Sequence, residues 1–445
     1  MDFSKPMHIV IIGGSSTGLM QGTMLSHLPT PHTITILERH SSSLRPDLAA
    51  GITTWPEFEL FMKFHDRVAQ PWSIHSPTVQ FLNKDASVKR EMKRELKMTS
   101  WSVIYYRLRR NFDGLKSEFC DGEVVVPEAE GGRDGDHHDE EEEEDHPKGK
   151  SQGKREFLTG MNVTSLSKLS DGGVEITYEN QNEANKEFKM NADMVILADG
   201  ANSSLRAKYF PDVKREYAGY VAFRGTVLES EVSEETKKIF DPSLTYFSYK
   251  GGYILLYIIP GSNGSLTPGS RRYNWVWYHP ISPSPSLTSL MTDTSGVLHR
   301  TTLPAGLMNP TAWAPYLTLS QSMMCAPFAE IISKTPSPFI TAINDSALPC
   351  ALLPGFDNRV LITGEALNLM RPHMALSTTQ SAMQALELEK VFTGSLTLGE
   401  WEKRVVKWGK VGVCKTNAFG LWNLSGVGAA LPWVLRLLGV LVGIL

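Results

Sequence analysis

The chain has 445 residues, which is long for one compact core, so we expect two intimately joined domains. Hydrophobic residues at 41% and aromatic residues at 9% exclude a fibrous, collagen-like or wholly disordered chain. The net charge of −4 conceals an acidic segment, because residues 128–145 hold eleven acidic residues against one arginine and the remainder carries +6. A mildly basic body suits a phosphate-bearing cofactor, and without a clustered basic module we expect no nucleic-acid partner.

The four cysteines show no CxxC spacing, which argues against a zinc site and a dense disulfide framework. We expect no metal site and a reducing, cytoplasmic location. The apolar stretch near residue 8 is too short for a signal peptide.

The first elements form a βαβ pattern. His8–Ile12 is a short β-branched run that ends at glycines, as a buried parallel strand does. A helix-like stretch over Leu19–Leu28 and a second strand over Thr33–Leu37 follow. Strand, glycine turn, helix and strand within about 30 residues define a βαβ unit.

Residues 121–154 are rich in charge and glycine and include the acidic run 139–145. Such a segment cannot bury enough apolar surface to offset chain entropy, so we predict a disordered acidic insertion. His137, His138 and His146 stand beside the acids, and we interpret them as part of a solvated loop rather than as metal ligands.

The rest of the chain alternates between strand-like and helix-like sequence, with no internal repeat. Turn residues separate aromatic and β-branched runs, which indicates an antiparallel sheet. A helix is expected at about 375–392. Strands are expected at 161–167, 174–178, 194–197, 217–227, 244–249, 253–259, 273–278 and 360–363.

The stretch from residue 421 to 445 is strongly apolar and is interrupted by Pro432 and Arg436 near its middle. A membrane span requires about 20 apolar residues with few charges. We therefore favour an amphipathic helix that packs on the body over membrane attachment, while peripheral or C-terminal membrane contact stays open.

A glycine motif follows the first strand directly. In Gly13-Gly14-Ser15-Ser16-Thr17-Gly18, Gly13 permits a tight turn and Gly18 permits close packing of helix on strand. Ser15 replaces the middle glycine of the dinucleotide fingerprint and narrows the approach to a pyrophosphate. Glu38 lies 20 residues past Gly18, where an acid can bond the ribose hydroxyls, which indicates FAD or NAD rather than NADP at this site.

A second motif, Asp199-Gly200-Ala-Asn-Ser203-Ser-Leu-Arg206, follows a predicted strand. It resembles the DGxxSxxR signature of the FAD-dependent aromatic hydroxylases, the class of para-hydroxybenzoate hydroxylase. The resemblance implies that FAD is the bound nucleotide and that Asp199, Gly200, Ser203 and Arg206 belong to its site. In that family the Asp lies near the FAD pyrophosphate and near the path of the nicotinamide cofactor.

A third segment, Gly364-Glu365 followed by Pro372 and Ser377 at the opening of a helix, resembles the third signature of that family. A helix N-terminus aimed at the flavin stabilises the negative charge of its reduced form. Two departures stand out. Glu365 replaces the usual Asp, and Ala375 and Ser377 replace glycines under the isoalloxazine.

Further cofactor contacts are implied by the resemblance alone. Arg45 and Gly51 resemble the loop that covers the flavin, and Arg39 follows the ribose-binding acid. Trp101 with the arginine-rich segment 106–109 resembles the helix whose arginine approaches the FAD. The usual arginine falls on Tyr106, and we assign the contact to its neighbour Arg107.

Residues 217–225 and 274–278 are similar to a narrower branch, which contains dihydroxypyridine hydroxylase and many fungal relatives. There these strands line the substrate chamber. Tyr220, Arg224 and Trp277 are candidates for the pocket, and His373 is the candidate polar group or base beside the flavin. A satisfied structural histidine is the alternative for His373, and ordinary sheet core is the alternative for most of the aromatics.

Covering all but the acidic insertion and the apolar end, the resemblance implies an α/β fold. A Rossmann-like FAD-binding domain with a parallel sheet interleaves with a mainly antiparallel β-sheet substrate domain, and C-terminal helices follow. We predict a discontinuous FAD-binding domain and a substrate-binding domain, with a C-terminal helical segment. The FAD-binding domain comprises residues 1–72, 99–209 and 340–400. The substrate-binding domain comprises residues 73–98 and 210–339, and the C-terminal helical segment comprises residues 401–445.

The implied activity is that of a flavoprotein monooxygenase. NAD(P)H, a transient reductant, and O2 would serve to hydroxylate a small aromatic or heteroaromatic substrate through a flavin C4a-hydroperoxide. One alternative is another FAD-dependent oxidoreductase of secondary metabolism, performing epoxidation, oxidative decarboxylation or dehydrogenation. A second is a catalytically degenerate flavin-fold binding protein, motivated by Ser15, Glu365 and the lost glycines. The sequence leaves the substrate and the oligomeric state open.

Overall fold

The computed structural model describes residues 1–47, 50–125 and 153–444. Most of the predicted acidic insertion, including its three histidines, lies outside the described residues. Within the described part of the range, Val124 forms an antiparallel bridge with Val68, so the prediction of disorder was wrong for this residue. Sequence alone gave no sign of this pairing, because a single bridge leaves no periodic pattern.

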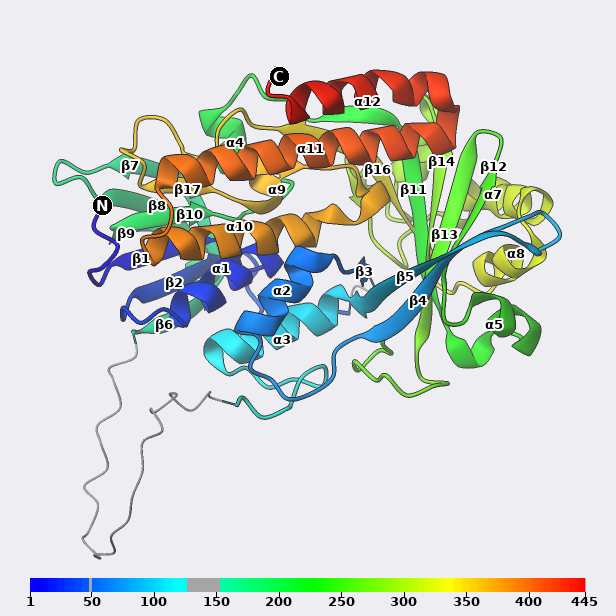
Figure 1. Cartoon of the computed structure of the whole chain (residues 1–445), viewed down its shortest axis with the longest axis horizontal. Coiled ribbons are helices and arrows are strands. Elements are labelled where there is room, and N and C mark those ends of the chain that lie inside the picture. The colour runs from blue at the N-terminus through cyan, green and yellow to red at the C-terminus, as the bar shows by residue number, and fades with distance from the viewer. Residues whose placement is uncertain (48–49, 126–152, 445) are drawn as a thin grey trace, which may run out of the picture.

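A parallel sheet forms the N-terminal side of the molecule (Figure 1). Its strand order β17-β10-β1-β2-β6 places β1, the first strand of the chain, at the centre. The strands are β1 (His8–Ile12), β2 (Thr33–Glu38), β6 (Arg155–Thr159), β10 (Met194–Leu197) and β17 (Val360–Ile362). Because β1 and β10 are buried on both faces, they are continuous apolar runs, as predicted.

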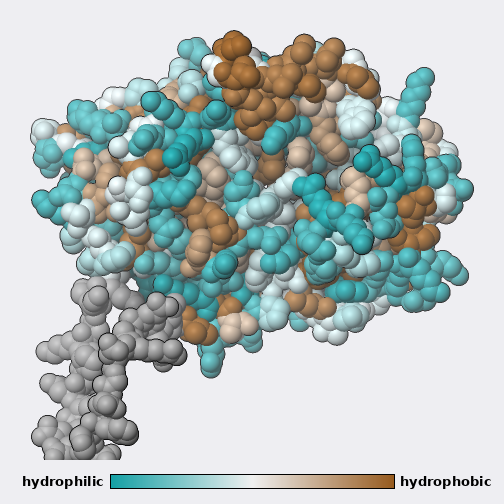
Figure 2. Space-filling view, viewed as in Figure 1, coloured by the Kyte–Doolittle hydropathy of each residue, from teal (hydrophilic) through white to brown (hydrophobic). Residues whose placement is uncertain are grey.

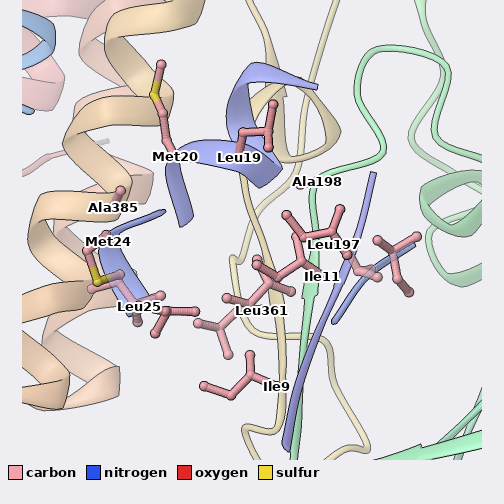
Figure 3. Packing of buried hydrophobic residues seen from close by; sticks show 14 of the residues in the cluster. Ile9, Ile11, Leu19, Met20, Met24, Leu25, Leu197, Ala198, Leu361 and Ala385 are labelled. Carbon is pink, nitrogen blue, oxygen red and sulfur yellow. The ribbon is translucent and has the colours of Figure 1, made fainter. Parts of the chain in front are cut away.

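Helices cover one face of this sheet and a small antiparallel sheet lies on the other side (Figure 1). Figure 3 shows the interior, where Leu19 and Leu25 of the first helix lie on the side of the strands that carry Ile11 and Leu361, and Met24 lies beside Ala385. The helices are α1 (Ser16–Ser26), α2 (Pro56–His65), α3 (Trp101–Asp113) and α10 (Leu376–Phe392); the small sheet contains β7 (Met161–Lys168), β8 (Val174–Asn180) and β9 (Lys186–Ala192).

A larger, mostly antiparallel sheet forms the other half, and ten described strands belong to it. Its core strands begin and end within two residues of the predicted positions. The strands are β3 (Gly51–Thr53), β4 (Ile74–Leu82), β5 (Val88–Ser100), β11 (Glu216–Leu228), β12 (Leu244–Tyr249), β13 (Gly252–Ile259), β14 (Arg272–Pro280), β15 (Thr302–Leu303), β16 (Phe339–Ala347) and β18 (Asn368–Leu369).

The two faces of this large sheet have different surroundings. One face packs on helices α5 (Glu234–Phe240), α6 (Pro285–Met291), α7 (Pro310–Met323) and α8 (Ala326–Ser333) around Phe223, Trp275 and Trp277. Trp277, a pocket candidate in the sequence, therefore belongs to this core. The other face carries Tyr220, Tyr253 and Tyr278 and looks toward the parallel sheet.

The connections between the halves place a long helix across both. Helix α11 (Leu398–Ser425) runs from the parallel sheet to β13 and β14, and α12 (Val427–Leu441) folds back along it (Figure 1). The predicted C-terminal helical packing is thus present. Among the residues described, no helix is both long enough and apolar enough to cross a membrane. The fold class is the predicted one, while the exact domain ranges stay a prediction.

Candidate functional site

Three turns meet at the carboxyl edge of the parallel sheet. They follow β1 at Gly13, β10 at Asp199 and β17 at Gly364. A Cβ atom added to Gly13 would lie 2.4 Å from the carbonyl oxygen of Ala198, and one added to Gly364 would lie 2.4 Å from Oγ1 of Thr17. The three predicted motifs are therefore adjacent in space, as ligand sites at the ends of parallel strands require.

The glycines of the first turn are packed against their surroundings. Gly13 adopts φ +106°, and a Cβ at Gly18 would lie 1.9 Å from the carbonyl oxygen of Gly13. Gly14 faces the ring of Phe157, which leaves no room for a side chain. Ser15 is the N-cap of α1 and its side chain makes no capping bond, so the hydroxyl stands at the turn.

A cavity of about 530 Å³ opens beside this turn. Glu38 lies in it and is held by the amides of Gly14 and His40, at 2.8 and 2.7 Å, and by Arg45 at 2.7 Å. Arg45 Nε has no hydrogen-bond partner among the described residues. These groups and Arg39 line the cavity together with Asp199 and Gly200, so the predicted ribose and phosphate residues share one space.

Asp199 is the residue that points most directly to a bound ligand. Its Oδ1 atom is buried and makes no hydrogen bond within the part of the chain that the structure describes. Burial raises the pKa of this carboxyl, while Ser203 and Arg206 oppose the shift. A buried, unpartnered carboxylate oxygen costs free energy, which a bound hydroxyl or amide donor would offset.

Two residues of the second signature support the turn itself. Ser203 caps α4 (Ser204–Tyr209) by accepting a bond from the amide of Arg206 at 2.9 Å. The guanidinium of Arg206 donates to the carbonyls of Ala201 and Glu365, at 2.5 and 2.9 Å. Arg206 therefore ties the second turn to the third, a role distinct from a direct cofactor contact.

The third turn contains more structure than the strand, turn and helix that we predicted. A short helix α9 (Gly364–Leu367), strand β18 and the 3-10 helix η3 (Pro372–Met374) precede α10. Glu365 accepts a bond from Ser377 Oγ at 2.6 Å, and Pro372 occupies the first turn of η3. The two departures from the family pattern thus pair with each other, the longer acid with the added hydroxyl.

Ala375 is the N-cap of the 17-residue helix α10 and adopts φ +52° and ψ 38°. This left-handed conformation explains why the family favours glycine here, and alanine adopts it at some cost. The backbone geometry is retained despite the substitution. Residues 374–378 line the neighbouring chamber, so the amides of the first turn of α10 face it.

This chamber lies between the third turn and the large sheet, and its volume is about 320 Å³. Aliphatic and aromatic side chains from six strands form most of its wall. The residues include Gly51, Ile52, Trp55, Val79, Phe81, Leu96, Arg94, Arg224, Tyr246, Tyr257, Tyr278, Glu365, Arg371, His373, Ser377 and Phe419.

Arg224 places a positively charged side chain in the wall of the chamber. Within the part of the chain that the structure describes, its buried Nε atom has no hydrogen-bond partner, and its guanidinium lies 5.5 Å from the centre of the Phe339 ring. Burial raises the pKa values of the adjacent Tyr257 and Tyr278, which therefore stay protonated at neutral pH. Arg371, by contrast, is paired with Asp345 at 2.6 Å.

His373 is held between two tyrosines. Its ring nitrogens lie 2.5 Å from the hydroxyl of Tyr220 and 2.6 Å from that of Tyr253. The ring is wedged against α11, where a Cβ at Gly420 would lie 2.1 Å from it. Burial lowers the pKa of His373 to about 3, so the imidazole is neutral at physiological pH. Both nitrogens are satisfied, which favours the alternative of a structural histidine that shapes the chamber floor.

This burial predicts a pH dependence of stability. The folded-state pKa of His373 lies below the unfolded value of about 6.5, so the unfolded chain binds the extra proton between pH 6.5 and 3. We expect the free energy of unfolding to fall on acidification through that window, by up to about 1.4 kcal/mol per pH unit from this group. Urea unfolding at several pH values should show a shallower slope for His373→Gln. An unchanged slope would contradict the neutral, buried imidazole.

The structure gives Arg107 a different role from the predicted flavin contact. Its guanidinium binds Asp66 at 2.5 Å and the carbonyl of Val68, in a buried position. Tyr106 instead reaches the Arg45 loop, because its hydroxyl accepts from the amide of Arg45 and donates to its carbonyl, both at 2.8 Å. Tyr106 therefore fixes the loop whose Arg45 lines the nucleotide cavity.

Two residues that support the site, Trp55 and Phe157, were not predicted from the sequence. Trp55 donates from its indole to the carbonyl of Met374 at 2.8 Å and so holds η3 in place. Phe157 packs on Gly14 and receives the guanidinium of Arg109 at 3.6 Å from the ring centre. Neither residue stands in a motif, and only the fold brings them to the turns.

Comparisons with known proteins agree with this architecture. Residues 217–345 match a family model described as FAD binding domain-like. 2,6-Dihydroxypyridine 3-monooxygenase of Paenarthrobacter nicotinovorans is 30% identical over 225 residues, or 50% of this chain and 54% of the relative. The match thus spans about half the length of that curated relative.

Solved structures extend the likeness over the chain. 2,6-Dihydroxypyridine-3-hydroxylase from Arthrobacter nicotinovorans superposes with a TM-score of 0.74 at 23% identity, covering 94% of this chain and 93% of that one. Klebsiella pneumoniae HpxO, solved with FAD and uric acid, gives 0.64 at 15% identity, over 97% and 92%.

The fold is therefore that of the FAD-dependent monooxygenases, and the predicted resemblance is confirmed. Within this class the chain is similar to the dihydroxypyridine hydroxylases, the branch that residues 217–225 and 274–278 indicated.

Proposed function

We propose that the protein binds FAD and uses it, with NAD(P)H and O2, to hydroxylate a small aromatic or heteroaromatic compound. The observation that carries the proposal is the meeting of three turns beside a cavity in which Asp199 Oδ1 has no hydrogen-bond partner among the described residues. A scaffold without a ligand would have little reason to keep that oxygen buried.

The residues present fit the dinucleotide. Glu38 would accept from the ribose hydroxyls, while the amide end of α1 and Arg45 would face the phosphates. Asp199 would accept a hydrogen bond in the same cavity. The first turn of α10 would lie against the flavin ring. Bound FAD would supply the redox chemistry, taking electrons from NAD(P)H and delivering them to O2.

The chamber walls support a small, flat and electron-rich substrate. Aromatic and aliphatic side chains exclude water, which protects reactive oxygen species from decay. Arg224 would bind an ionised hydroxyl or carboxyl group, since it has no acidic partner among the ion pairs of the described residues. Relatives with this fold are named for dihydroxypyridine and one was solved with uric acid, and both compounds are small heteroaromatics with acidic protons.

His373 would act by position rather than by direct proton transfer. Its bonds to Tyr220 and Tyr253 fix the floor of the chamber next to η3. Tyr220 itself lies behind His373, so we assign both residues to positioning.

The test is to purify the full chain, reconstitute it with FAD and measure NAD(P)H oxidation with a panel of phenols and hydroxypyridines. We expect a yellow protein whose NAD(P)H oxidation is stimulated by a compound in the panel. The product should carry oxygen-18 from labelled O2. A product without the label would indicate dehydrogenation, and a protein that FAD cannot reconstitute would support the non-catalytic alternative.

A further inference from the structure

The outer face of α12 is apolar and exposed. Seven side chains recur at spacings of three and four residues, so they share one side of the helix. Their exposed fractions lie between 41% and 69%. The residues are Val427, Leu431, Val434, Leu435, Leu438, Leu441 and Val442. Figure 2 shows the corresponding hydrophobic band along the edge of the molecule where α12 lies.

The helix is already anchored on its other side, so this face is not needed for packing within the chain. Ala430 and Val440 are buried, and Trp433 faces a groove between α12 and β16. Helix α12 rests on α11 along its length (Figure 1). Large contiguous apolar patches are uncommon on monomeric soluble proteins and mark contact surfaces.

The charge of the chain beside this face is mainly positive. Residues 403–445 contain six lysines and arginines and no acidic residue. Lys403, Lys407 and Lys410 are exposed and line a groove with Val440 and Gly443 at the end of α12. Glu402 lines the same groove, but its carboxylate already accepts hydrogen bonds from the amides of Ala351 and Leu352, both at 2.9 Å. None of the three lysines forms an ion pair with another described residue.

These features distinguish between two occupants. A second copy of the chain would bring its own lysine row toward the first, without an acid in the segment to offset the repulsion. A bilayer surface with anionic headgroups would accept the apolar side chains at the acyl boundary and the lysines at the headgroups. The 15 residues of α12 span about 22 Å, enough to lie in the interface but short of the hydrocarbon thickness.

We propose that α12 docks the protein on an anionic membrane surface, with its axis in the plane of the interface. The protein is then a peripheral membrane protein held by the outer face of α12 and by the lysines of α11. This inference is independent of the proposed catalytic function, because none of the seven side chains lines the candidate chamber.

Flotation of the full chain with lipid vesicles tests this inference. We expect binding to vesicles of phosphatidylcholine with about a third phosphatidylserine, weaker binding to phosphatidylcholine alone, and loss of binding at high salt. The triple variant Leu431→Ser, Leu435→Ser and Leu438→Ser should bind at least about tenfold more weakly. Lys403→Gln, Lys407→Gln and Lys410→Gln should each weaken binding to the anionic vesicles by about fivefold.

A matched control replaces exposed apolar residues elsewhere. Leu228→Ser, Val297→Ser and Leu298→Ser remove side chains of similar exposure from the distant sheet and loop, and this variant should float like the parent protein. Equal flotation of the α12 variant and the parent would overturn the proposal. So would a parent that ignores vesicles but forms a dimer that the α12 substitutions dissociate, since the face would then belong to a second copy.

Discussion

Replacing Gly18 with alanine is expected to abolish flavin retention and to lower the free energy of unfolding by about 3 kcal/mol or more. The added Cβ would lie 1.9 Å from the carbonyl oxygen of Gly13 and 3.2 Å from Ile11. The Gly13 carbonyl cannot easily move away, because Gly13 is itself packed closely against Ala198 of the second turn. Relief would require α1 to move away from β1, which would open the nucleotide cavity.

Gly399→Ala provides the matched control for this prediction. Gly399 lies in the first turn of α11 and a Cβ there meets nothing within 4 Å. Alanine at that position should be neutral or stabilise the protein by several tenths of a kcal/mol. Urea unfolding and the flavin absorbance per mole of protein measure both effects. A Gly18→Ala protein that remains yellow and as stable as the parent would contradict the assigned turn geometry.

Much of the fold could be predicted because its central strands are simple patterns. The β-branched runs His8–Ile12 and Met194–Leu197 are buried on both faces and end at glycine-containing turns, so local sequence and tertiary position agree. Other strands were harder to predict. Strand β5 is largely charged and exposed over its first eight residues, and its sequence gives no apolar alternation to find.

The candidate site likewise contains residues that the sequence predicted and residues that it did not. Gly13, Glu38 and Asp199 stand at fixed offsets from strands, and the fold brings them together as the motifs predicted. Arg107 was misassigned because one position along a helix rotates a side chain by about 100°. That rotation turns it toward Asp66, while Tyr106 faces the Arg45 loop. The pairing of Glu365 with Ser377 depends on a turn whose path the sequence did not reveal.

Pro432 and Arg436 in the C-terminal apolar stretch favoured a helix that packs on the body, and the structure contains such a helix, α12, packed on α11. The exposure of the outer face of α12 could not be predicted. An apolar helix that packs with both faces and one that packs with a single face have similar sequences. Only the position of α12 on α11 shows that seven of its side chains remain uncovered.

Arg224 is expected to determine how strongly the chamber binds an ionised substrate. A charge-assisted hydrogen bond inside an apolar chamber is worth more than one at the surface, and the loss of one partner leaves the other charge buried. Substituting Arg224→Gln should therefore lower kcat/KM for the preferred acidic substrate by about 100-fold, while the flavin content is unchanged. Arg224→Lys should restore part of the loss, since it keeps the charge but not the planar geometry.

Arg94→Gln separates this effect from a general loss of positive charge. Arg94 also lines the chamber, but it is exposed and stacks on Trp55 at 4.3 Å, so its charge is already solvated. We expect kcat/KM to change by less than about fivefold in this variant. Steady-state NAD(P)H oxidation coupled to product formation measures both variants at one ionic strength. Equal losses for the two arginines would show that the chamber attracts anions through its overall field. A selective loss at Arg224 would identify it as the anchor, because of the two arginines only this half-buried one has a buried Nε without a hydrogen-bond partner among the described residues.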